Sequence, residues 1–402
     1  MKKNAKRLLG LLIVLAMMVS LVGTMALADS TAAADKPVVT YIGTSVSSGF
    51  FLPQNKDDWI NEDDWNTIVK EWTSADFNGS EDDVHMAYRP YNALVPGSAP
   101  RIIATELGLP VDENNRCEAY FHKLCFTGMR TKEALRFLYG KNSLYDRSCR
   151  SDWLSEEYMK GHYSGFKEAD TKYFYDHAQN WVKGSDIVIV ELGGNDVMTT
   201  VIDNLFDERG TFLRSVKALN VRALHDALVD IVQKGGDLSS VVITALDAAQ
   251  KAGELPLMMT CMTKALMDGT LMFYTNYGKI ISRIYQLNPK AKVIAVGTFN
   301  PLAKLPVVEN VQISAGILMD SSIKMMNAYM KNLAPYAQSR LFKYRFADIS
   351  DVELAGFKSK SLLDLLTNGT MDNFSATQTG PIHPSADGHA YMAEQILAAI
   401  KK

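Results

Sequence analysis

Five short runs of apolar and β-branched residues, separated by long helical patterns, most constrain what this chain can fold into. Three of the runs are almost continuously apolar, which is typical of strands buried on both faces of a parallel sheet. Between them, apolar residues recur at three- and four-residue steps, as on the buried face of an amphipathic helix. The predicted strands are 38–42, 119–124, 186–192, 291–297 and 342–348, and the clearest helices are 272–287, 314–333 and 387–400.

This alternation predicts an α/β protein: a three-layer αβα sandwich around a flavodoxin-like parallel sheet, of strand order 2-1-3-4-5, with helical insertions. In such sheets the reactive groups lie on loops beyond the carboxyl ends of the strands. Ser45 follows the first predicted strand, Asn195 follows the third, and His383 lies between the fifth strand and the last helix. We therefore expect the three side chains to lie along the same edge of the sheet.

Ser45 and His383 together have the chemistry of an activated nucleophile. A serine hydroxyl is a poor nucleophile at neutral pH, and an adjacent imidazole that accepts its proton makes it reactive. Each residue also has a purely structural interpretation. Ser45 lies on a glycine-rich turn, Asn195 and Asp196 could cap a following helix, and His383 stands next to Pro384 at a helix entrance.

The N-terminus predicts a signal peptide over residues 1–28, and hence a secreted or extracytoplasmic protein. A basic leader precedes an apolar run over 8–22, which is short for a membrane span, and small residues then stand two apart at Ala26 and Ala28. A retained membrane anchor is the less favoured alternative. The leader's four basic residues are Lys2, Lys3, Lys6 and Arg7; without them the formal net charge moves from −3 to −7.

An acidic mature chain argues against nucleic-acid binding, which requires clustered Lys and Arg. Residues 29–402 contain no Pro- or Ser-rich linker, so we expect one domain with two insertions. Residues 49–94 form a loop insertion whose tryptophans either recognise a ligand or pin the loop to the core. Residues 213–272 form a helical, Met-rich insertion that either covers an acyl chain as a lid or packs between helices. The tryptophans are Trp59, Trp65 and Trp72.

Four cysteines have no zinc-site spacing. On a predicted extended strand, Cys117 and Cys125 would lie too far apart to bond each other. A bridge from either to Cys149 remains open, and so do free buried thiols. Cys261 completes the set.

Four ordered motifs resemble the conserved blocks of the SGNH hydrolase superfamily, the GDSL-type esterases and lipases. They lie at 43–49, 126–131, 193–196 and 383–389. The resemblance implies that Ser45 is the nucleophile and His383 the general base. It also implies an oxyanion hole made by the backbone amides of Ser45 and Gly128 and the side-chain amide of Asn195. Gly97 is the alternative to Gly128 as the oxyanion glycine.

Two positions depart from the family pattern. Thr44 stands where the family has aspartate, and we expect altered local hydrogen bonding there. Gly380 occupies the position of the family's acid, which orients the catalytic imidazole. A second carboxylate could substitute, or a backbone carbonyl could accept from the imidazole, or the protein could be weakly active or inactive. The candidate carboxylates are Asp348 first, then Asp351 and Asp372.

The resemblance implies a secreted serine esterase that hydrolyses carboxylic esters, of lipid or O-acetylated glycan, through an acyl-enzyme. It implies no metal and no organic cofactor. The expected partner is a small-molecule or polymer ester, with transient contact to a membrane or cell wall. The main alternative is a non-catalytic glycan- or cell-wall-binding protein of the same fold. A weaker alternative is a flavodoxin-like phosphate binder that uses the turn at 43–49.

Overall fold

The computed structural model describes residues 36–49, 94–113, 115–126, 128–150, 168–206, 255–301, 311–354 and 383–402. The predicted signal peptide, the three tryptophans of the loop insertion, and residues 213–254 of the helical insertion lie outside these ranges. Asp372 and Gly380 do so too. In the segments that are described, no helix combines the length and apolar character needed to cross a bilayer.

A five-stranded sheet of order β2-β1-β3-β4-β5, in which every pairing is parallel, forms the centre of the fold. This confirms the predicted α/β class and the order 2-1-3-4-5. All five strands lie within one or two residues of their predicted positions. They are β1 (Val39–Gly43), β2 (Phe121–Cys125), β3 (Ile187–Glu191), β4 (Lys292–Val296) and β5 (Lys343–Ala347).

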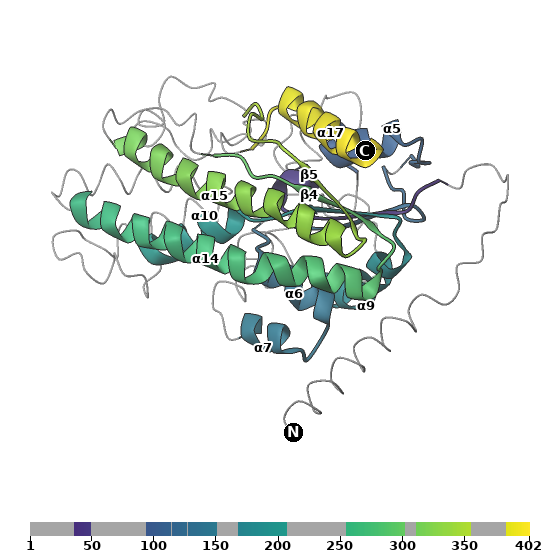
Figure 1. Cartoon of the computed structure of the whole chain (residues 1–402), viewed down its shortest axis with the longest axis horizontal. Coiled ribbons are helices and arrows are strands. Elements are labelled where there is room, and N and C mark those ends of the chain that lie inside the picture. The colour runs from purple at the N-terminus through teal and green to yellow at the C-terminus, as the bar shows by residue number, and fades with distance from the viewer. Residues whose placement is uncertain are drawn as a thin grey trace, which may run out of the picture. The chain divides into compact units, whose positions relative to one another are not determined.

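Helices cover both faces of the sheet, which explains why its central strands are largely apolar. Alternate residues of β3 join different cores: Val188 and Val190 belong to one cluster, and Ile187 and Ile189 to the other. The first core includes residues of α6 (Thr131–Tyr139), α9 (Glu168–Gly184), α10 (Gly194–Phe206), α14 (Leu255–Leu287) and α15 (Val311–Ser339). The second includes residues of α5 (Ala99–Glu106) and α17 (Ala386–Lys401), which Figure 1 shows on the opposite side of the sheet from α14. The short helices α2 (Ser45–Ser48) and α7 (Leu144–Arg150) complete the set described.

The described end of the predicted helical insertion, residues 255–272, is the first part of α14 and packs closely against α10. Met262 and Leu266 are buried in the core on this side, and Gly269 lies directly against the α10 backbone. Met267 and Leu271 are exposed. This stretch therefore contributes helix–helix packing, one of the two roles considered for the insertion.

All four cysteines are free and buried. Cys125 donates its thiol proton to the carbonyl oxygen of Tyr41 at 3.3 Å. Burial raises the pKa of the Cys149 thiol to about 12. Of the alternatives left open by the sequence, the structure has the free thiols, and burial also raises the thiol pKa of Cys125 and Cys261.

The contact between α14 and α10 leaves no room for a side chain at Gly269. A Cβ there would lie 2.7 Å from the Cα of Val197, and still closer to the carbonyl oxygen of Asp196. Backbone atoms cannot move aside cheaply, so we expect Gly269→Ala to lower the free energy of unfolding by ~1–3 kcal/mol. The matched control is Gly184→Ala, because a Cβ at that exposed helix end meets nothing within 4 Å. Urea unfolding of both variants is the measurement, and equal midpoints would contradict this packing.

Candidate active site

Ser45 and His383 meet at the carboxyl edge of the sheet. The Oγ atom of Ser45 lies 3.0 Å from Nε2 of His383, although 338 positions separate the two residues in the chain. Both side chains are buried, with exposed fractions of 7% and 5%. The distance is that of a hydrogen bond, as proton transfer between a nucleophile and its base requires.

A tight turn between β1 and α2 presents Ser45. Thr44 caps α2, since its Oγ1 accepts a hydrogen bond from the backbone amide of Val46 at 3.3 Å. Gly49 ends the helix in the left-handed conformation at φ +74°, which glycine adopts without strain. A strand, a capped single turn and a glycine stop thus hold the serine at the end of β1.

Glu191, the last residue of β3, secures this turn from the side. Its carboxylate accepts hydrogen bonds from the backbone amide of Thr44 at 3.1 Å, from Thr44 Oγ1 at 3.1 Å, and from Ser47 Oγ. Burial raises the pKa of Glu191 to about 7, while the hydrogen bonds from Ser47 and Thr44 act in the opposite direction. Glu191 was not among the site residues predicted from the sequence. Its signal was a lone carboxylate on an otherwise apolar strand.

His383 is tied to the segment that follows β5. Its neighbour Pro384 forms an antiparallel bridge with Leu354, and the amide of Ser385 donates to the carbonyl oxygen of Glu353 at 2.9 Å. Ser385 then caps α17, because its Oγ accepts from the amide of Gly388 at 3.0 Å. These contacts fix the chain immediately after the imidazole.

The histidine before α17 and the histidine in its first turn have different surroundings. Burial lowers the pKa of His383 to about 4, so its imidazole is neutral at physiological pH and able to accept a proton. His389 is fully buried, and its Nδ1 accepts a hydrogen bond from the amide of Ala99 at 3.3 Å. His389 thus links α17 to the first turn of α5, in keeping with a structural role.

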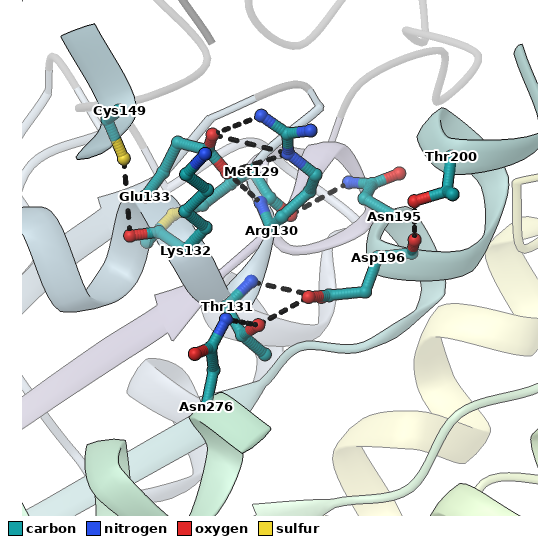
Figure 2. Close-up of polar contacts among 10 residues, drawn as sticks. All are labelled: Met129, Arg130, Thr131, Lys132, Glu133, Cys149, Asn195, Asp196, Thr200 and Asn276. Atoms are coloured by element: carbon teal, nitrogen blue, oxygen red, sulfur yellow. Dashed lines mark hydrogen bonds and ion pairs between the residues drawn. The ribbon is translucent and has the colours of Figure 1, made fainter. Parts of the chain in front are cut away.

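Gly128 and Asn195 lie at the ends of the two strands that flank β1. Gly128 is buried between β2 and α6 with φ +78°, a conformation that favours glycine. Asn195, in the first turn of α10, is partly exposed, and its Nδ2 donates to the carbonyl oxygen of Met129 at 3.1 Å (Figure 2). This contact ties the side chain of Asn195 to the loop between β2 and α6.

Asp196 caps α6 across the site, whereas the sequence suggested a cap on its own helix. Its carboxylate accepts from the amide of Thr131 at 2.9 Å and from the Thr131 hydroxyl, and Asn276 Nδ2 donates to that hydroxyl at 3.2 Å (Figure 2). A buried ion pair at 2.6 Å between Arg130 and Glu133 lies at the same helix end. Burial raises the pKa of Asp196 to about 7, against the lowering effect of the Thr131 hydrogen bonds.

Two other residues that the sequence suggested for the site, Gly97 and Asp348, have different surroundings. Gly97 is exposed in the turn before α5, and a Cβ there would meet nothing within 4 Å. Asp348 is exposed, and its Oδ1 accepts from the amide of Ser350 at 3.0 Å. The charges of Asp351 and Asp348 also add to burial in raising the pKa of Tyr391. The hydrogen bond described for Asp348 is therefore the one from Ser350. Within the described ranges, no cluster of three or more His, Cys, Asp or Glu side chains is arranged to hold a metal ion.

Comparisons with known proteins yield only distant similarity. No protein-family model matches the chain, and no curated protein matches it. A phospholipase A1 from Streptomyces albidoflavus is 12% identical at a TM-score of 0.39, covering 90% of this chain and 99% of that one. A lipase from a goat rumen metagenome is 12% identical at 0.38, covering 90% and 97%. A carbohydrate esterase family 2 enzyme from Corynascus thermopiles is 15% identical at 0.33, covering 93% and 69%. These scores are too low to carry an argument, and the fold assignment rests on the sheet itself.

The raised pKa of Asp196 has a testable consequence for stability. Its pKa of about 7 in the fold exceeds the ordinary value of 3.8, so folding favours the protonated carboxyl. The resulting stabilisation is complete below the ordinary pKa and is lost as the pH rises through about 7. Asp196→Asn cannot titrate. We therefore expect the stability advantage of the wild type over this variant to shrink between pH 4 and pH 7. Urea unfolding across this range measures it, and an advantage that grows with pH would contradict the assignment.

Proposed function

We propose that this chain is a secreted serine hydrolase of the SGNH type, which cleaves carboxylic esters of lipids or O-acetylated glycans through an acyl-enzyme on Ser45. The observation that carries the proposal is the 3.0 Å contact between Ser45 Oγ and His383 Nε2. A buried hydroxyl bonded to a neutral imidazole is the arrangement that nucleophilic catalysis uses. The turn, the cap and the bridge around these residues all hold that contact in place.

The chemistry follows from the two side chains. Ser45 Oγ attacks the ester carbonyl while His383 Nε2 takes the hydroxyl proton. His383 then gives this proton to the leaving alcohol as the tetrahedral intermediate collapses to the acyl-enzyme. A water molecule, deprotonated by the same imidazole, attacks the acyl group and releases the acid and the free serine. The scheme requires no metal and no organic cofactor.

Three groups are proposed to stabilise the negative charge on the intermediate: the amides of Ser45 and Gly128 and the side-chain amide of Asn195. Their positions after β1, β2 and β3, neighbouring strands of one sheet, support this role. The loss of one such donor typically raises the barrier by ~2.7–4 kcal/mol. The acid that orients the imidazole stays a prediction: Asp348, the first candidate, accepts its described hydrogen bond from the amide of Ser350.

The first test is covalent labelling. A fluorophosphonate probe should modify the wild type, and Ser45→Ala should lose labelling completely because the attacking oxygen is gone. Ser48→Ala is the matched control: that serine lies in the same helical turn, but its hydroxyl donates to the carbonyl oxygen of Thr44. We expect this control to be labelled. A folded wild type that is neither labelled nor active on p-nitrophenyl esters would contradict the proposal and favour a non-catalytic binding protein, as Gly380 in place of the family's acid would allow.

The second test is the pH dependence of the reaction. Because burial holds the pKa of His383 at about 4, the imidazole stays neutral and basic well below its ordinary value of 6.5. The labelling rate should therefore disappear only as the pH falls through about 4. Circular dichroism at each pH would show that the protein remains folded. Complete loss of labelling near pH 6.5 would instead mean that the pKa of His383 is unperturbed.

A further inference from the structure

We propose that Glu191 is a positioning residue for the nucleophile, and that its buried carboxylate holds the turn that carries Ser45 in the reactive geometry. This inference rests on the proposed function, since it assigns Glu191 a part in the reaction of Ser45. Glu191 is distinct from the proposed nucleophile, base and oxyanion donors. It contacts the turn that carries Ser45 from the end of β3, which none of those residues does.

The contacts of Glu191 bracket Ser45 on both sides along the chain. Thr44, the residue before it, donates its amide and its hydroxyl, and Ser47, two residues after it, donates its hydroxyl. Thr44 in turn accepts from the amide of Val46. The serine therefore stands between two attachment points on one carboxylate, which comes from a strand 147 positions away from Thr44.

Burial means that water cannot replace this carboxylate. Thr44 and Ser47 are buried, and Glu191 is only 8% exposed. A Cβ at Gly43 would lie 2.9 Å from Oε2 of Glu191, so the carboxylate sits close against the turn's own backbone. If the acceptor were removed, donors at Thr44 and Ser47 would be left unsatisfied in the interior. The turn would then shift to find new partners, and Ser45 would shift with it.

The same segment also anchors the opposite side of the site. Five residues after Glu191, Asp196 binds Thr131 at the start of α6, next to the loop that contains Gly128. Glu191 and Asp196 are thus two buried carboxylates on one strand–helix connection. Glu191 binds the turn that carries Ser45, and Asp196 binds the start of α6, next to Gly128. Displacements on the order of 1 Å in such a site can cost ~10²-fold in rate.

The protonation state of Glu191 gives a readout that a purely structural role would lack. In the described part of the chain, Glu191 interacts electrostatically with Tyr41 on β1 and Cys125 on β2, and burial raises the pKa of both, so they stay neutral. Ionised Glu191 has acceptor capacity for all its donors, whereas the protonated form commits one oxygen to an O–H group. Burial places the pKa at about 7, so the acceptor capacity of Glu191, and with it the geometry of the turn, should change as the pH passes through this value.

The experiment compares the wild type with Glu191→Gln, using a fluorophosphonate probe between pH 5 and pH 9. We expect the maximal inactivation rate at pH 8 to fall ~10–100-fold, the range of a small misplacement, with the probe's inhibition constant changed less than twofold. In the wild type we expect a partial step in rate near pH 7, absent from the variant. Hydrogen exchange at the amides of Val46, Ser47 and Ser48 should be faster in the variant.

The matched control is Asp146→Asn, another fully buried carboxylate, which accepts from Arg136 Nε at 3.0 Å outside the site. This variant should be less stable than the wild type. It should keep the wild-type inactivation rate, the step in that rate near pH 7, and the wild-type hydrogen exchange of the turn. A folded Glu191→Gln protein with the wild-type rate, or one that keeps the step near pH 7, would overturn the inference. If the variant does not fold, Ser47→Ala removes one donor and should show the same changes on a smaller scale. A wild type that is never labelled would defeat the proposed function, and hydrogen exchange would still decide whether Glu191 holds the turn.

Discussion

The contact between Ser45 and His383 depends on a parallel sheet in which β1 lies inside, between β2 and β3. This placement brings the ends of three strands side by side, and with them Ser45, Gly128 and the segment that contains Asn195. His383 arrives from the other end of the chain. It is brought to the same edge because Pro384 pairs with Leu354 after β5, the last strand of the sheet. No local feature of the sequence brings Ser45 and His383 together, so their contact depends on the whole fold.

The site is assembled from buried polar groups, each of which would destabilise the fold if it stood alone. Glu191 is satisfied by Thr44 and Ser47, and Asp196 by Thr131. The Arg130–Glu133 pair adds a buried ion pair at the end of α6. Every one of these groups fixes a loop that carries a candidate catalytic residue. The burial that makes the network costly is also the cause of the low pKa of His383, which keeps its imidazole neutral.

The sheet could be predicted from the sequence because strands buried on two faces have nearly continuous apolar sequences. All five strands, and their order in the sheet, were predicted correctly. The alignment of Ser45, Asn195 and His383 on one edge followed from the same rule. What could not be predicted were the partners of polar groups. Glu191 reads as a polar interruption of a strand until Thr44 is placed beside it, and Asp196 reads as a cap on its own helix. Asp348 was the first candidate to orient the imidazole, but its place after β5 does not show that its carboxylate accepts from the amide of Ser350.

The most direct test of the central claim is a crystal structure of the protein after treatment with diethyl p-nitrophenyl phosphate, a tetrahedral mimic of the reacting ester. We expect a phosphoryl group on Oγ of Ser45, with Nε2 of His383 within hydrogen-bond distance of the adduct. One phosphoryl oxygen should point toward the amide of Gly128 and the side chain of Asn195. Unmodified Ser45, with its hydroxyl and the His383 imidazole held beyond hydrogen-bond reach of each other, would contradict this site.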